Sequence, residues 1–481
     1  MPPGSDDASV YRGARSGYFV SSDTSDWQQL YASQLANGCI RRGCTPPSKD
    51  QSFVSRRVFD REIAMLERVP PQFRELQEIS IQTDTRDILA HATRQSESHE
   101  DYFLVDIDAH VTETSFWPEI LALIDNDVIR QMGEANSARP GSAGHALLNL
   151  QPGILHQDLY GRIPHQQALL EPVEKKGVHH FTELARRAMD ALGLDYQIVF
   201  PTPMLTLGMH PQDDIEAALA GAYNRWLIER ILPEDDRLKG LLYLPFNTPE
   251  ACVEQVARYA HVDSVIGFTV CSTRNKPVHH NNYMKLYALM EETGKPFAFH
   301  SGFNWNDPSF LQLNRFISMH ALSFVHYNLI HMTNWIINGL PERFPKLKVM
   351  WVESGLAWIP FLMQRLDHEY QMRSCEAPLL KKLPSDYMRD MFYTSQPLEK
   401  TNPKFLQATM EAFNADTQLL YASDWPHWDF DPPSSITTLP FLTEQARRNI
   451  LGLNAARVFN LEVKRKRPKA RNVLASRPGL S

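Results

Sequence analysis

Histidine and carboxylate side chains stand at the ends of three short apolar runs in this sequence. The first run ends in DIDAH, with Asp108 and His110; the second ends in PFAFH, with His300; the third ends in YASD, with Asp424. Asp108 and His110 are two residues apart, so in a strand both side chains point to the same side. Two imidazoles and two carboxylates suit one divalent ion, with Zn favoured and Mn or Fe as alternatives. No other cofactor is expected.

These runs belong to a series of short apolar segments that alternate with helical patterns, which is typical of parallel α/β folds. Eight alternations, with no GxGxxG after the first segment, favour a (β/α)8 TIM barrel over an open dinucleotide-binding sheet. Catalytic residues of such barrels come from the carboxyl ends of the strands, where the three ligand-bearing runs end. The eight predicted strands are Tyr102–Asp108, Tyr196–Phe200, Leu241–Pro245, Val265–Val270, Pro296–His300, Leu347–Glu353, Met391–Thr394 and Leu419–Asp424.

Segments outside this alternation predict an extension, an insertion and a tail. Residues 1–100 are polar and weakly periodic, and we expect a partly disordered N-terminal extension with one amphipathic helix at Arg57–Arg74. The barrel is expected to span residues 101–463, and residues 464–481 form a basic C-terminal tail, expected to be solvated and disordered. The first βα gap holds predicted helices at Phe116–Ile129 and Phe181–Leu192. A Gly/Ser/Pro-rich insertion between them is expected to cover the barrel mouth.

Composition and charge limit the classes of protein to which this chain can belong. The chain has 481 residues, 43% of them apolar, which allows a large core, and its net charge of −7 gives no reason to expect nucleic acid as a partner. Five scattered cysteines do not predict a disulfide framework. The polar N-terminus predicts no secretory signal, and no run of eighteen apolar residues predicts a membrane span. We therefore expect a cytoplasmic protein that acts on a small molecule.

Five segments resemble one known family. They are VDIDAHVTE at 105–113, FAFHSG at 297–302, GLPERFPKLKVMWVESGLAWIP at 339–360, YASDWPHWDFD at 421–431 and LGLNAARVFNL at 451–461. The chain is similar over about residues 102–463 to the amidohydrolase-related family that includes aminocarboxymuconate-semialdehyde and resorcylate decarboxylases. The resemblance implies the barrel fold of the amidohydrolase superfamily, a homodimer, and one divalent metal bound by Asp108, His110, His300 and Asp424. One departure is that the related decarboxylases keep a histidine at the end of the sixth strand, where this chain has Glu353.

Further residues near the predicted strand ends are candidates for the site. Glu353 is expected to be catalytic, as a proton shuttle, an aid to the metal or a group that orients His300; an N-cap is the structural alternative. His427 is expected to be catalytic, in contact with the substrate or just behind the metal ligands, with a structural hydrogen bond in its loop as the alternative. Glu113 is expected to lie at the barrel mouth. An apolar or aromatic substrate is expected to lie against Trp305, Trp358, His320 and Trp428.

Two reactions fit these residues, and hydrolysis is the first choice. A metal-activated water would attack a carbonyl compound, and Asp424 would accept the proton of that water. The alternative is non-oxidative decarboxylation of an aromatic or unsaturated carboxylic acid, with Arg274 or Arg315 as candidate partners of the carboxylate. A non-catalytic ligand-binding barrel is the alternative of another class, but it would have no need of four metal ligands. The sequence does not identify the substrate.

Overall fold

The computed structural model describes Leu89 and residues 99–137, 177–274, 276–302, 307–427 and 429–467. Backbone contacts divide the chain into Met1–Glu75 and Leu76–Ser481, and all described residues belong to the second unit. The predicted helix Arg57–Arg74 and most of the predicted insertion lie outside the described residues. Trp305 and Trp428 lie outside them as well.

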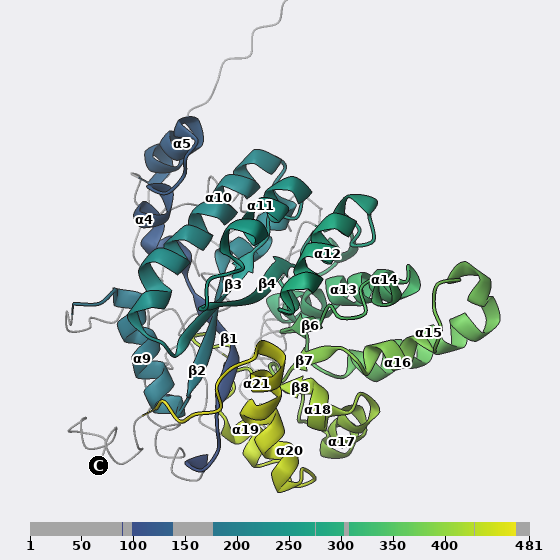
Figure 1. The fold of residues 1–481 in the computed structure, drawn as a ribbon. Helices are drawn as coiled ribbons and strands as arrows, with labels where there is room; N and C mark the ends of the chain where they lie inside the picture. The colour runs from purple at the N-terminus through teal and green to yellow at the C-terminus, as the bar shows by residue number, and fades with distance from the viewer. Residues whose placement is uncertain are drawn as a thin grey trace, which may run out of the picture. The chain divides into compact units, whose positions relative to one another are not determined.

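Parallel strands in the order β1 to β8 form the centre of the fold (Figure 1). Each predicted strand overlaps one of them, and β3 begins three residues before its prediction. The predicted (β/α)8 barrel is therefore confirmed. The strands are β1 (Val105–Val111), β2 (Tyr196–Pro201), β3 (Leu238–Tyr243), β4 (Val265–Cys271), β5 (Phe297–His300), β6 (Val349–Val352), β7 (Phe392–Thr394) and β8 (Leu419–Leu420).

Helices connect successive strands, as the helical patterns in the sequence predict, but the predicted helix Phe116–Ile129 is divided into two helices by residues 122–126. Up to β4 they are η3 (Glu113–Phe116), α4 (Trp117–Leu121), α5 (Asp127–Ser137), α9 (His180–Leu192), η4 (Pro203–Met209), α10 (Asp213–Trp226), η5 (Leu227–Ile231), η6 (Leu232–Glu234) and α11 (Pro249–Tyr259). From β4 to β7 they are η7 (Asn281–Tyr283), α12 (Met284–Thr293), η8 (Pro308–Phe310), α13 (Phe316–Ile337), α14 (Leu340–Arg343), α15 (Trp358–Arg373), η9 (Ser374–Glu376) and α16 (Pro384–Met388). The last are α17 (Pro403–Ala412), α18 (Ala415–Gln418), α19 (Ser434–Thr437), α20 (Glu444–Arg448), η10 (Asn449–Leu453) and α21 (Asn454–Phe459).

The segment that follows β8 brings the end of the barrel against its beginning. The backbone N–H of Asp424 donates to the carbonyl oxygen of Asp108 over 2.7 Å, and that of His110 donates to Trp425 over 2.7 Å. The chain just after β8 is thus fixed along the last residues of β1. This pairing brings three of the four predicted metal ligands to one seam of the barrel.

Alternation along the strands separates an inner core from an outer core. On β5, Phe297 and Phe299 point outward and contact Trp335 of α13, with ring centroids 6.2 and 5.9 Å apart. Ala298 belongs to the inner cluster of apolar side chains, so His300, two residues further on, also faces inward. The alternation of side chains along β5 therefore directs His300 into the barrel interior.

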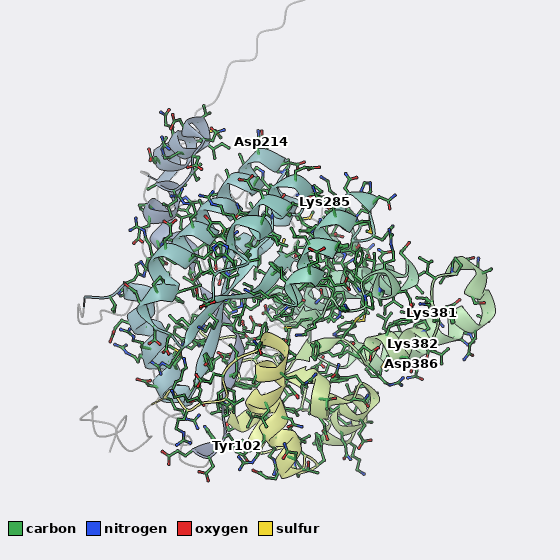
Figure 2. All side chains as sticks on the ribbon, viewed as in Figure 1. Tyr102, Asp214, Lys285, Lys381, Lys382 and Asp386 are labelled. Atoms are coloured by element: carbon green, nitrogen blue, oxygen red, sulfur yellow. The ribbon has the colours of Figure 1, made fainter. Side chains whose placement is uncertain are left out.

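Charged side chains lie on the outer helices, as Figure 2 shows for Asp214 of α10 and Lys285 of α12. The tail contributes one buried cation: the guanidinium of Arg467 donates to the carbonyl oxygens of His99, Glu100 and Tyr102. The expectation of a solvated tail is therefore corrected for Lys466 and Arg467, whereas Lys464 and Arg465 are exposed. Within the described ranges, no helix is both long enough and apolar enough to cross a bilayer.

Candidate active site

A β-bulge in β1 turns Asp108 into the barrel. One extra residue of β1 lies between the register pairs Asp106↔Gln197 and Ala109↔Val199. The buried Asp106 carboxylate holds this bulge, because its Oδ1 accepts the backbone N–H of Asp108 over 3.2 Å. The same carboxylate accepts from Ser423 N at 2.8 Å, from Ser423 Oγ at 2.6 Å and from Gln197 Nε2 at 3.2 Å. Asp106 therefore fixes both segments that present carboxylates to the site, and the sequence analysis missed it.

The predicted ligands converge at the carboxyl ends of the strands. Asp108 Oδ1 lies 3.1 Å from His300 Nε2 and 3.3 Å from His110 Nε2, and Asp424 Oδ1 lies 3.1 Å from His110 Nε2. All four residues are buried. Atoms bound to one ion at about 2.1 Å and at right angles are about 3 Å apart, so these spacings suit donors to a single metal.

Backbone carbonyl groups orient both imidazoles. His110 Nδ1 lies 2.9 Å from the oxygen of Pro201, and His300 Nδ1 lies 2.7 Å from that of Ser301. A carbonyl oxygen can only accept, so Nδ1 carries a hydrogen and each ring directs its Nε2 toward the carboxylates. A carboxylate oxygen and an Nε2 atom without its hydrogen are both electron-pair donors, so a cation between them would be bound by both. Asp108 Oδ2 is also buried without a hydrogen-bond partner among the described residues. The donor set therefore fits a divalent metal ion.

Charges within the cluster oppose the effect of burial. Burial disfavours the charged form of Asp108, but His300 and His110 outweigh it and lower the pKa of this carboxyl. Burial likewise disfavours protonated His110, but the hydrogen bonds and charges of Asp108 and Asp424 raise its pKa well above the usual value. A metal cation would compete with protons for these donors, so its binding would weaken as the pH falls.

Asp424 forms a buried pair with His427. His427 Nδ1 donates to Asp424 Oδ1 over 2.6 Å, and its Nε2 lies 3.3 Å from Thr202 Oγ1 at the end of β2. The imidazole of His427 stacks on that of His110, with ring centroids 4.2 Å apart. This geometry connects a carboxylate of the cluster to a second titratable group.

Glu353 immediately follows β6 and faces the same cluster. Its Oε2 lies 3.7 Å from His300 Nε2, and one donor atom each of Asp108, His110, His300 and Glu353 lie within 4.8 Å of one another. A second set of donors within this distance consists of His110, Asp424 and His427. The two sets share His110, so the structure brings six side chains together.

A buried polar network lies behind the cluster, on α13. The side-chain amide of Asn328 donates to Ser301 Oγ over 2.9 Å and to Ser354 Oγ, and its oxygen accepts from Ser272 Oγ. These serines follow β4, β5 and β6, and two of them are the next residues after His300 and Glu353. Asn328 thus fixes three strand ends at once. One of the two asparagines in an apolar helix gave no sequence signal for this role.

Several predicted site residues lie elsewhere or act otherwise. Trp358 packs edge-on against Tyr393 with ring centroids 6.4 Å apart, in the outer core between barrel and helices, so the expectation that it contacts substrate is wrong. Glu113 is fully buried and accepts the backbone N–H groups of Thr202 and Met204, so it holds the chain after β2 instead of lining the mouth. His320 lies on α13 beside Phe324.

Arg274, one of the two predicted partners of a substrate carboxylate, lies in the outer core. Its guanidinium lies 4.0 Å from the ring centroid of Phe246 and donates to Tyr283 Oη over 3.0 Å. These groups belong to the outer core. Arg274 therefore stabilises the packing outside the barrel. Arg315 is exposed at the start of α13.

Curated relatives of this chain include γ-resorcylate decarboxylases. The γ-resorcylate decarboxylase of Rhizobium sp. is 23% identical over 295 residues, which cover 57% of this chain and 86% of the relative. The γ-resorcylate decarboxylase of Rhodococcus jostii is 21% identical over 264 residues, covering 52% of this chain and 79% of the relative. Both matches span most of the length of the relative.

Solved structures with the same fold include 5-carboxyvanillate decarboxylase from Sphingomonas paucimobilis, with a TM-score of 0.53 and 20% identity, covering 75% of this chain and all of that one. The enzyme of that name from Novosphingobium aromaticivorans, complexed with manganese and 4-hydroxy-3-methoxy-5-nitrobenzoic acid, has a TM-score of 0.54 and 19% identity, covering 76% and 97%. A family model described as amidohydrolase matches residues 105–461. Because this match runs from the first residue of β1 to just beyond α21, the chain belongs to the amidohydrolase family and is an enzyme of the amidohydrolase superfamily.

Proposed function

We propose that this enzyme catalyses the metal-dependent, non-oxidative decarboxylation of an aromatic carboxylic acid. The observation that carries the proposal is the buried cluster of Asp108, His110, His300 and Asp424, in a barrel whose relatives are named as decarboxylases of such acids. The comparisons favour this reaction over hydrolysis, which the sequence alone had put first. The small-molecule ligands of the structural neighbours support a substrate of the same size.

One divalent metal ion would be held by the four strand-end ligands. Neighbouring structures hold manganese, so we favour Mn2+ over the Zn2+ that the donor types alone had suggested. When bound, such an ion supplies a Lewis acid that polarises the oxygen atoms of the substrate. Phe200 lies beside His110 and His300, with ring centroids 6.1 and 4.7 Å away, and offers an apolar face next to these ligands.

The reaction also needs an acid. The bond between the ring carbon and the carboxylate breaks, CO2 leaves, and the electron pair stays on the ring carbon, which then takes a proton. Asp424 is the acid best placed to give it, because it is hydrogen-bonded to His427, an imidazole that can return a proton afterwards. The described residues thus supply a set of candidate metal ligands and a proton-transfer pair, and the carboxylate of Asp424 belongs to both.

The test is a substrate panel. Purified protein is stripped with a chelator, reloaded with Mn2+ and incubated with 2,6-dihydroxybenzoate, 5-carboxyvanillate and aryl esters and amides of similar size. We expect CO2 release from at least one hydroxybenzoate, with the metal-free protein and an Asp108→Asn, His300→Asn double variant inactive. Cleavage of an ester or amide, with no CO2 from any acid, would replace decarboxylation by hydrolysis.

A further inference from the structure

Glu353 lies where a ligand from β6 would reach the same ion as His300. Strands β5 and β6 pair with His300 opposite Val352, so Glu353 is one residue beyond the partner of His300. Its carboxylate is buried, with a side-chain exposure of 3%, and Oε2 lies 3.7 Å from His300 Nε2. The Nε2 atom of His300 is directed toward this oxygen and toward Asp108 Oδ1, because Nδ1 donates to the carbonyl oxygen of Ser301. A metal cation between these three atoms would be bound by all of them.

The backbone of Glu353 is held in an uncommon conformation. Its φ of 53° lies in the left-handed region, which non-glycine residues rarely adopt and which persists only where neighbours enforce it. The N–H of Glu353 donates to Thr394 Oγ1 over 3.0 Å, and the next residue, Ser354, accepts from Asn328. Asp424, in the segment after β8, has a φ of 62°. Both carboxylates are therefore turned into the site by the same backbone conformation.

We propose that Glu353 is a fifth protein donor to the metal, in addition to Asp108, His110, His300 and Asp424. Five donors exceed the four of a tetrahedral zinc site but leave room in a six-coordinate one. Carboxylates suit Mn2+, whereas imidazoles suit Zn2+, so the third carboxylate raises the preference for Mn2+. The proposal rests on the metal site of the proposed function but not on the reaction, because metal binding is measured without substrate.

The experiment titrates chelator-stripped protein with MnCl2 and, separately, with ZnCl2 by calorimetry. We compare the wild type, Glu353→Gln, Glu353→Asp and a control, Glu216→Gln, which changes a buried glutamate on α10. Loss of groups that only orient ligands weakens metal affinity about 10–100-fold, so loss of a ligand should weaken Mn2+ binding at least about tenfold. We expect a smaller loss for Zn2+, partial recovery with aspartate and no change in the control.

A second readout separates binding from folding. Melting of the metal-free Glu353→Gln protein should match the wild type, while the rise in melting temperature on adding Mn2+ should shrink. Glu353→Gln with wild-type affinities for both ions would overturn the fifth-ligand proposal and leave the proposed function standing. A wild type that binds neither ion would overturn both.

Discussion

His427 Nδ1 donates to Asp424 Oδ1 over 2.6 Å while the same oxygen lies 3.1 Å from His110 Nε2. Asp424 Oδ1 thus contacts a candidate metal ligand, His110, and also forms a titratable pair with His427. Asp424→Asn should therefore lower kcat by about 10²–10⁴-fold at saturating Mn2+, the range for loss of a general acid. Measured in the same way, Glu353→Gln should lose only about 10–100-fold, since its main defect is in metal affinity. If Glu353→Gln is at least as damaging at saturating Mn2+, Glu353 is the acid and Asp424 is not.

Asp106 tests whether the bulge of β1 positions the ligands. Asparagine at this position would place an amide donor against N–H and O–H donors, so Asp106→Asn should lower the free energy of unfolding by about 2–4 kcal/mol. Ser423→Ala removes only one side-chain bond to Asp106 and should cost about 1 kcal/mol. Urea unfolding and Mn2+ titration of both variants measure the effect. Equal and small losses in the two variants would show that Asp106 does not hold the site.

Stability of the metal-free protein should depend on pH through Glu113. Burial raises the pKa of Glu113 from 4.5 to about 7, against backbone hydrogen bonds from Thr202 and Met204 that lower it. Between these values the folded chain keeps a proton that the unfolded chain loses, so stability falls as the pH rises through this window. The shift corresponds to about 3 kcal/mol.

Urea unfolding at several pH values checks this dependence. The wild type should lose about 3 kcal/mol relative to Glu113→Gln between pH 4.5 and 7.5, because glutamine does not titrate. Glu292→Gln, at an exposed position of α12, should run parallel to the wild type. A wild-type curve parallel to that of Glu113→Gln would contradict the buried, protonated state of Glu113.

The first 88 residues should not be needed for the metal. The candidate donors lie on β1 and β5 and in the segments after β6 and β8, and Leu89 is the earliest described residue in the core. A chain that begins at Leu89 should bind Mn2+ with the stoichiometry and affinity of the full chain. Elemental analysis and calorimetry measure both quantities. A loss of stoichiometry would show that the N-terminal segment completes the site.

The sequence predicts the barrel well because strand ends and ligand types coincide. His300 could be assigned to the interior from the period of two along β5, and Asp424 from its position after an apolar run. Asp108 faces the interior for a reason that the sequence does not show, namely the extra residue that follows Asp106. The DxH spacing gave the right pairing of Asp108 with His110, but the bulge decides which side of the sheet they face.

The remaining site depends on backbone geometry and on distant contacts. Glu353 faces His300 because its backbone is in the left-handed region, and no pattern of side chains predicts this conformation for a non-glycine residue. Trp358 follows a strand end, as a substrate contact would, but it is the first residue of α15 and packs outside the barrel. Glu113 lies near the ligand pair in sequence, yet its carboxylate is used by two N–H groups beyond β2. The positions of Glu353, Trp358 and Glu113 near strand ends or ligands in the sequence marked them as candidates, but did not predict their roles.

Isotope incorporation during turnover tests decarboxylation most directly. The Mn2+-loaded enzyme is given its best carboxylic acid substrate, once in D2O and once in H2(18)O, and the aromatic product is analysed by mass spectrometry and NMR. We predict CO2 release, one deuterium at the carbon that carried the carboxylate, and no 18O in the aromatic product. A product that gains 18O without release of CO2 would contradict decarboxylation and establish hydrolysis.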